Sequence, residues 1–382
     1  MTGLQQKLPP RVKQRRLYWA AAVLAAAALA INIVASWKVY RHEPLREAAS
    51  RSLFAANSSF FYDSGLAEPL PVFSLKLAMA AGADPDAALR VQGLAVLALL
   101  GIVTFFVMRR SFGRIAAIMA VLFLGVNPYF GFYAMQGGSH LYALLFLLLF
   151  WHYFDSPGGG RREALLAGLA GGLACLSRLD AGWVLLILAA CSLLARRKKF
   201  SPWPAALSLG LVLLLALPYL GWQKAKYSNF FYAQELSLRR WANVDSYGYA
   251  PGAPYQAAPL GPAAFVFRNG ASGAMQSFFS GLGRAFSYEL PRTVYHKFLF
   301  ILVFLGAYAA FTLKKDGLLF FLAAALLPVL PLATIKQVPA AGGIELRYYL
   351  WAAWALFALA GLGFQELLAL LGRRLQLAAE KK

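Results

Sequence analysis

The sequence predicts an all-α integral membrane protein with about ten transmembrane helices and two long loops that carry amphipathic helices. Three observations support this fold class. Hydrophobic residues make up 60% of the 382 residues, charged residues make up only 14%, and apolar stretches alternate with polar segments along the whole chain. A soluble domain normally has about a quarter charged residues. We therefore interpret residues 1–382 as a single polytopic membrane domain.

The predicted spans follow the apolar stretches, and several are shorter than the roughly 20 residues that a straight crossing requires. Their ranges are 17–36, 87–108, 114–129, 139–154, 163–177, 182–195, 203–222, 297–313, 317–335 and 348–371. The first apolar run follows a basic segment and is too long for the core of a cleavable signal peptide. We expect it to be an uncleaved anchor.

The basic residues predict which side of the membrane each loop occupies. If the N-terminus is cytoplasmic, alternate loops hold 20 of the 37 Lys and Arg residues against four acids. Cytoplasmic loops characteristically carry this excess. We therefore place residues 1–16 and 372–382 in the cytoplasm. The net charge of +21 then reflects topology and contact with anionic lipids, and does not indicate nucleic-acid binding.

Two predicted outer loops are long, at residues 37–86 and 223–296. The first contains Pro44–Ala56 and Pro69–Ala81, which we interpret as interfacial amphipathic helices because each has Pro at a plausible helix start. Long ordered loops usually carry function. Candidate functional residues are therefore expected in these loops and in two shorter outer segments, Tyr129–Gly138 and Lys336–Arg347.

Acidic residues of the first outer loop are candidates for proton transfer. His42 and Glu43 directly follow the first span, where a carboxylate can take a proton from a hydroxyl group. A solvated loop charge is the alternative interpretation. Asp63 and Glu68 lie further along the same loop. Asp63 fits turn chemistry and Glu68 fits a helix cap, and both are also candidate substrate contacts.

Basic residues near the outer ends of spans are candidates for binding an anion. Arg178 and Asp180 lie where two apolar spans meet, a depth at which ionisable residues suggest function. A structural ion pair is the alternative. Arg347 and Tyr348 open the last span. Arginine can form two parallel hydrogen bonds with a phosphate, whereas interfacial anchoring is the alternative.

The second outer loop interleaves basic and aromatic residues, which suits a phosphate group together with a sugar. Lys224 and Lys226 are its leading cations, and an interfacial belt is the alternative interpretation. The four histidines lack the spacing of metal ligands, and the two cysteines lie in apolar spans. No glycine-rich nucleotide signature is present. We expect no metal or cofactor, and the sequence favours a lipid-borne donor substrate.

The order of these features resembles the GT-C class of polytopic glycosyltransferases. It is most similar to the bacterial family-39-like mannosyl-, aminoarabinosyl- and arabinofuranosyltransferases, which use polyprenyl-phosphate sugars at the outer face. The likeness covers most of the chain as a set of weak motifs. These are Glu47 to Leu53, Phe61 to Gly65, Glu68-Pro69-Leu70, Gly82 to Arg90, Ser177 to Ala181, and Arg347-Tyr348.

Two positions depart from the family pattern. The family usually has an Asp, often as Asp-Asp or Asp-Glu, just after the first span, where this chain has His42-Glu43. By resemblance, Glu43 occupies the second acidic position. The segment from Gly137 to His140 stands where relatives of the arabinofuranosyltransferase type tend to carry an acid.

The resemblance implies a protein of the bacterial cytoplasmic membrane that transfers a sugar from a polyprenyl-phosphate donor to an acceptor at the outer face. Glu43, assisted by His42, would deprotonate the acceptor, and Arg347, Arg178 and the Lys224/Lys226 pair would hold the phosphate. The second hypothesis is a catalytically degenerate GT-C-like scaffold or lipid-binding subunit of a larger complex. A transporter would be expected to show an internal repeat, and we find none.

Overall fold

The computed structural model describes most of the chain. The described residues are 11–45, 49–58, 68–155, 160–195, 202–236, 238, 261–313, 316–327, 329–330 and 346–380. Within these ranges the regular structure is helical and contains no β-strand, which confirms the predicted all-α fold class. The helices are α1 (Arg11–Tyr40), α2 (Ala49–Asn57), α3 (Pro69–Ala80), α4 (Pro85–Ser111), α5 (Arg114–Gly125), α6 (Pro128–Met135), α7 (Ser139–Phe154), α8 (Arg161–Ser177), α9 (Ala181–Ala195), α10 (Pro202–Tyr227), α12 (Pro262–Val266), α13 (Gly270–Arg284), η1 (Ala285–Glu289), α14 (Leu290–Val294), α15 (Leu299–Thr312), α16 (Asp316–Leu326), η2 (Leu346–Tyr349) and α18 (Leu350–Glu380).

Helices α4 and α6 begin for the same local reason. Each has Pro in its first turn, where the missing N–H costs nothing, and a polar residue just before it. The Asp84 carboxylate accepts a hydrogen bond from the amide of Ala87. The Asn127 side chain accepts from the amides of Tyr129 and Phe130. These caps satisfy amides that the first turn of a helix leaves without partners.

Long apolar helices make this a multi-pass membrane protein. Four described helical stretches are long and apolar enough to cross a membrane: Leu17–Tyr40, Pro85–Ser111, Trp203–Tyr227 and Leu346–Arg373. Two bent helix pairs pass the same test, with a bend of 59° between α5 and α6 and of 107° between α13–α14 and α15. Counting each bent pair as one span gives six among the described residues.

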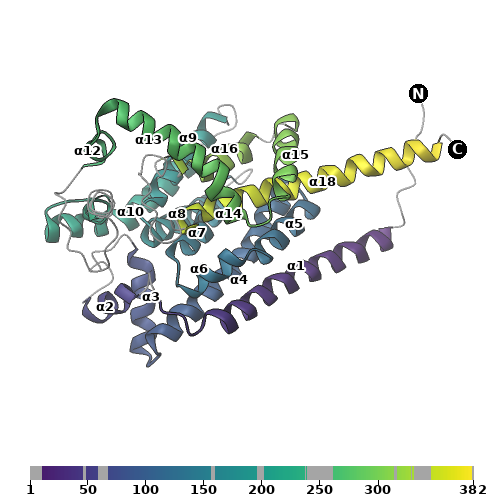
Figure 1. Ribbon diagram of the computed structural model, residues 1–382. Helices are drawn as coiled ribbons and strands as arrows, with labels where there is room; N and C mark the ends of the chain where they lie inside the picture. Colours follow the sequence, from purple (N-terminus) through teal and green to yellow (C-terminus); the bar gives the residue numbers. More distant parts are fainter. Residues whose placement is uncertain are drawn as a thin grey trace.

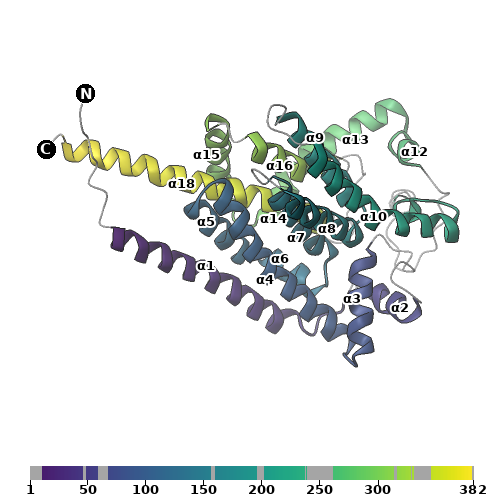
Figure 2. The same cartoon turned by 180° about the vertical axis from the view of Figure 1, so that it is seen from behind.

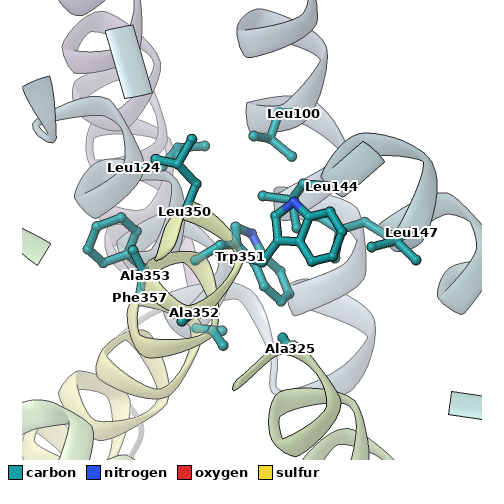
Figure 3. Packing of buried hydrophobic residues seen from close by; sticks show 14 of the residues in the cluster. Leu100, Leu124, Leu144, Leu147, Ala325, Leu350, Trp351, Ala352, Ala353 and Phe357 are labelled. Carbon is teal, nitrogen blue, oxygen red and sulfur yellow. The ribbon is translucent and has the colours of Figure 1, made fainter. Parts of the chain in front are cut away.

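The helices form one elongated bundle with α1 and α18 as its longest members. The first residues of α1 and the last turns of α18 point toward the same side, and α2 and α3 lie at the opposite end (Figures 1 and 2). The first turns of α18 enter the hydrophobic core. Figure 3 shows Leu350, Trp351 and Phe357 of this helix among Leu124 of α5 and Leu144 of α7.

Helices α15 and α18 touch through their backbones. A Cβ atom added to Gly306 of α15 would lie 1.9 Å from the carbonyl oxygen of Leu359, and one added to Gly363 of α18 would lie 1.9 Å from that of Leu302. Because no side chain larger than hydrogen fits at either position, the two helices pack at the shortest separation that their backbones allow.

Two details differ from the sequence prediction. The predicted span 114–129 is divided, because Asn127 and Pro128 end α5 and start α6. Consequently, most of the predicted outer segment Tyr129–Gly138 is helical. In addition, the predicted helix Pro44–Ala56 does not begin at its proline. Pro44 and Leu45 are not helical, and the described helix α2 is Ala49–Asn57. The prediction Pro69–Ala81 corresponds to α3.

Candidate functional site

A buried segment, residues 136–140, consists of the turn between α6 and α7 and the first two residues of α7, and we call it the buried turn. Gly137 has a φ of 66°, a conformation that residues with a Cβ atom rarely adopt. Gln136, Ser139 and His140 are each at most 3% exposed. Since buried polar groups need hydrogen-bond partners, this turn is a point at which polar groups from other elements must converge.

Arg51 and Glu68 form the first ion pair beside this turn. Nε of Arg51 donates to Oε1 of Glu68 at 2.9 Å, and Nη2 donates to Oε2 at 2.8 Å. Arg51 is only 2% exposed and also donates to the carbonyl oxygen of Gly137. Burial alone would raise the pKa of Glu68, but Arg51 and a hydrogen bond from Ser139 outweigh burial and hold that pKa below its usual value.

The predicted capping role of Glu68 is wrong. The residue stands at the N-cap position of α3, but its side chain makes no cap hydrogen bond. Both carboxylate oxygens are used by Arg51, and a charge-assisted pair with two parallel bonds is stronger than a single bond to an amide.

Arg178 and Asp180 form the second ion pair, in the turn between α8 and α9. Nε and Nη2 of Arg178 donate to Oδ1 and Oδ2 of Asp180 at 2.9 and 2.8 Å. Nη1 of Arg178 donates to Oγ of Ser139 at 3.2 Å, which joins this pair to the buried turn. Burial would lower the pKa of Arg178, but the carboxylate of Asp180 outweighs burial and raises it.

Arg347 and Tyr348 approach the same turn from η2. Nη2 of Arg347 donates to the Tyr348 hydroxyl at 3.2 Å. The Tyr348 ring packs edge-on against the His140 ring, with 5.2 Å between centroids. Trp351 Nε1 donates to the carbonyl oxygen of His140 at 2.8 Å. The first turn of α18 is thereby fixed to the first turn of α7.

We call this group of side chains the arginine cluster. Its members are Arg51, Glu68, Ser139, His140, Arg178, Asp180, Arg347 and Tyr348. The three guanidinium groups all lie close enough to His140 to act on it electrostatically. With three arginines and two carboxylates, the cluster carries one net positive charge.

The segment that carries His42 and Glu43 is also linked to the buried turn. Gln136 Nε2 donates to the carbonyl oxygen of Pro44 at 3.4 Å. The buried side chain of Arg90 in α4 donates to the carbonyl oxygens of Tyr40 and Glu43 at 2.7 and 2.6 Å. The backbone of this segment is therefore fixed, whereas the side chains of His42 and Glu43 are exposed.

The structure gathers five of the ten predicted site residues into the arginine cluster: Glu68, Arg178, Asp180, Arg347 and Tyr348. Lys224 and Lys226 lie at the end of α10, where Lys224 donates to the carbonyl oxygen of Ser228 and lies against Phe230, and Lys226 lies against Tyr227. None of these partners belongs to the cluster. Asp63 lies outside the described residues.

Sequence reasoning did not assign roles to Arg51, Arg90, Ser139 or His140. The adjacent glycines Gly137 and Gly138 were the available signal, because two glycines between apolar stretches indicate a turn with unusual backbone angles. The groups that such a turn would contact come from elements distant in sequence, so their identity could not follow from the pattern.

Comparison with known proteins gives one family match. Residues 67–222 match the family described as dolichyl-phosphate-mannose-protein mannosyltransferase. This range includes Glu68, the turn 136–140 and the Arg178–Asp180 pair, and it leaves out Glu43 and Arg347. No curated protein matches the sequence.

Solved structures similar to this one include AglB and ArnT. The oligosaccharyltransferase AglB of Archaeoglobus fulgidus, in complex with an inhibitory peptide and a dolichol-phosphate, has 16% identity and a TM-score of 0.51. The match covers 96% of this chain and 52% of AglB. The chain has a GT-C fold. The class predicted from the sequence is therefore confirmed at the level of the fold.

The second similar structure is ArnT of Cupriavidus metallidurans, bound to undecaprenyl phosphate. It has 17% identity and a TM-score of 0.47. The match covers 93% of this chain and 61% of ArnT. The chain thus spans between half and two thirds of the length of these two proteins.

Proposed function

We propose that this protein is a membrane glycosyltransferase that moves a sugar from a polyprenyl-phosphate donor to an acceptor at the outer face of a bacterial cytoplasmic membrane. One observation carries the proposal most directly. In a GT-C fold, the segment 136–140 contacts Pro44, the residue after the exposed Glu43, and also belongs to a cluster of three arginines. The dolichol-phosphate in the similar AglB structure supports a lipid phosphate as the anion.

The proposed topology has about ten spans with both termini in the cytoplasm. The basic residues of alternate loops support it. The described helices add a second argument, because the start of α1 and the end of α18 lie on the same side of the bundle (Figures 1 and 2). In this topology the arginine cluster and Glu43 belong to the outer side.

The phosphate of the donor would bind at the arginine cluster. Glu68 and Asp180 offset two of the three guanidinium charges, which leaves an environment that suits an anion. Arg178 and Arg347 are the proposed phosphate contacts. Lys224 and Lys226 are proposed as a further cation pair for the lipid head group, and Asp63 stays a predicted substrate contact.

In the proposed reaction, Glu43 removes the proton from an acceptor hydroxyl, with His42 beside it as an assisting group. The acceptor oxygen attacks the anomeric carbon with inversion, the bond from that carbon to the phosphate oxygen breaks, and its electron pair leaves with the polyprenyl phosphate. The leaving phosphate gains negative charge, which the arginine guanidinium groups would stabilise. No metal or cofactor is part of this scheme.

The test is sugar transfer in membranes supplied with labelled polyprenyl-phosphate sugars. Loss of a general base typically lowers turnover about 10²–10⁴-fold, and this is the effect expected of Glu43→Gln. The matched control is Glu163→Gln, which removes an acid that caps the start of α8, about 22 Å along the helix from Arg178 at its other end. Transfer that survives Glu43→Gln would remove Glu43 from the mechanism and leave the enzyme hypothesis standing.

A second candidate function is a catalytically degenerate scaffold or lipid-binding subunit of a larger membrane complex. The observation in its favour is the His42-Glu43 pair, which departs from the acidic pattern of the family the chain resembles. Under this alternative the protein would bind a lipid phosphate but transfer no sugar from any donor, and Glu43→Gln would leave lipid binding unchanged.

A further inference from the structure

We propose that His140 is a substrate-contacting residue whose imidazole forms a direct hydrogen bond with the phosphate of the lipid-linked substrate. This inference rests on the proposed function and adds to it a residue that the resemblance does not assign. His140 lies in the buried turn and belongs to the arginine cluster.

The first argument is the burial of an imidazole without hydrogen bonds. The His140 side chain is 3% exposed, and neither Nδ1 nor Nε2 has a hydrogen-bond partner among the described residues. Buried polar atoms are nearly always hydrogen-bonded, because losing water without replacing its bonds destabilises the folded state. Two such atoms on one ring indicate a position at which a ligand supplies the missing partner.

The second argument is that packing alone already fixes the ring. The Tyr348 ring packs edge-on against the His140 ring, with an angle of 87° between the ring planes. The ring centroids of Trp351 and His140 lie 6.4 Å apart, and Trp351 Nε1 donates to the carbonyl oxygen of His140. These aromatic contacts hold the imidazole in place without forming a hydrogen bond to either of its nitrogens. A ring oriented in advance loses little freedom when it forms a hydrogen bond with a ligand.

The third argument is the chemistry of the neighbours. Arg51, Arg178 and Arg347 all act electrostatically on His140, and guanidinium groups are donors only. They therefore cannot accept the N–H of a neutral imidazole. A phosphate has several acceptor oxygens and can take hydrogen bonds from arginine and from the imidazole N–H together. A phosphate thus both neutralises the net positive charge of the cluster and supplies a hydrogen-bond acceptor to the buried imidazole.

Helix α7 provides a matched control at its other end. His152 is on the same helix, its Nδ1 also has no partner among the described residues, and its ring packs against an adjacent tyrosine, Tyr153. It lies twelve residues from His140, about 18 Å along the helix axis. A substitution there perturbs the same helix without entering the arginine cluster.

The experiment measures binding of undecaprenyl phosphate and of undecaprenol to the full chain in lipid nanodiscs, together with thermal unfolding. We expect His140→Phe to weaken phosphate binding about tenfold or more, to leave undecaprenol binding unchanged, and to unfold at the same or a higher temperature. His140→Asn restores a donor and an acceptor, so it should recover most of the affinity. His152→Phe should change neither affinity.

The outcomes separate this inference from the proposed function. One outcome is that the intact protein binds undecaprenyl phosphate more tightly than undecaprenol, and that His140→Phe binds undecaprenyl phosphate as tightly as the intact protein does. In that case His140 is not a phosphate contact and the proposed function stands. If the intact protein does not distinguish the two lipids, both fail. If His140→Phe lowers the unfolding temperature, the affinity of His140→Asn for undecaprenyl phosphate decides whether His140 is a phosphate contact. An affinity as weak as that of His140→Phe overturns the inference.

Discussion

The arginine cluster and the His42–Glu43 segment are both linked to the buried turn, but they are held in different ways. In the cluster, charged side chains hold one another through ion pairs such as Arg51–Glu68 and Arg178–Asp180. In the segment, Arg90 and Gln136 donate to backbone carbonyl oxygens, and the Glu43 side chain is exposed. One region fixes its charges, and the other fixes its backbone.

This difference matches the separate tasks of the proposed reaction. A site that stabilises a leaving phosphate works best when its dipoles and charges are oriented before the reaction begins. A base must exchange protons with successive acceptors, so its carboxylate needs access to them. The comparison therefore predicts that substitutions in the arginine cluster chiefly lower stability, whereas substitutions in the His42–Glu43 segment chiefly lower turnover.

The largest expected effect is on stability, from Arg51→Met. Removing one partner of a buried ion pair leaves the other charge uncompensated, which typically costs about 3–5 kcal/mol of unfolding free energy. Thermal or denaturant unfolding in detergent measures this loss. The double variant Arg51→Met with Glu68→Met should recover much of it, since no unpaired carboxylate remains. Arg161→Met, at an exposed arginine, is the control and should unfold like the intact protein.

The second prediction concerns Arg90→Met, which removes the clamp on the other region. The carbonyl oxygens of Tyr40 and Glu43 lose their donor, and this should lower stability by about 1–3 kcal/mol, less than Arg51→Met does. Turnover should fall about 10²-fold, because displacing a catalytic group by about 1 Å can cost that much. Sugar transfer and undecaprenyl phosphate binding are measured side by side. Loss of binding with unchanged turnover per bound lipid would contradict the comparison.

The smallest expected effect is a pH dependence that belongs to the cluster alone. The pKa of Glu68 is below its usual value of 4.5, so its ionised form stabilises the folded state. This contribution is fully present above about pH 4.5 and is lost as the pH falls through the lowered folded-state pKa. Unfolding temperatures of the intact protein and of Glu68→Gln should therefore differ at pH 7 and converge in acid. A difference that stays constant down to pH 3 would contradict the assignment.

Much of the fold could be predicted because long apolar runs are a local signal. The predicted span 139–154 coincides with α7, and the predicted span 163–177 differs from α8 by two residues at one end. The division between α5 and α6 was missed, although Asn127-Pro128 is a turn signal of the kind that starts a helix. The segments before and after Asn127-Pro128 are both apolar, and this pattern outweighed the turn signal. A hydropathy pattern does not record the angle of a bend.

The candidate site could be predicted in part. The Arg178–Asp180 pair was accessible because its partners are two residues apart, and Arg347 was indicated by its place at a span end. The partner of Glu68 could not be predicted from the sequence. A local helix cap and a tertiary ion pair with Arg51 are competing roles for its carboxylate, and only the fold decides between them. His140 was missed for the same reason, since its neighbouring arginines come from three different parts of the chain.

The contact between Gly306 and Gly363 links the middle of the bundle to the site. Gly363 lies thirteen residues, about 20 Å, along α18 from Leu350, and η2 with Arg347 and Tyr348 directly precedes Leu350. A single methyl group added at either glycine cannot be absorbed by a side-chain rotation, because the obstacle is backbone on both sides. Helix α18 would have to shift or tilt away from α15 as a rod, and Arg347 and Tyr348 would move with its first turn. The lack of a side chain at Gly306 and Gly363 therefore fixes the position of α18 and, with it, the position of Arg347.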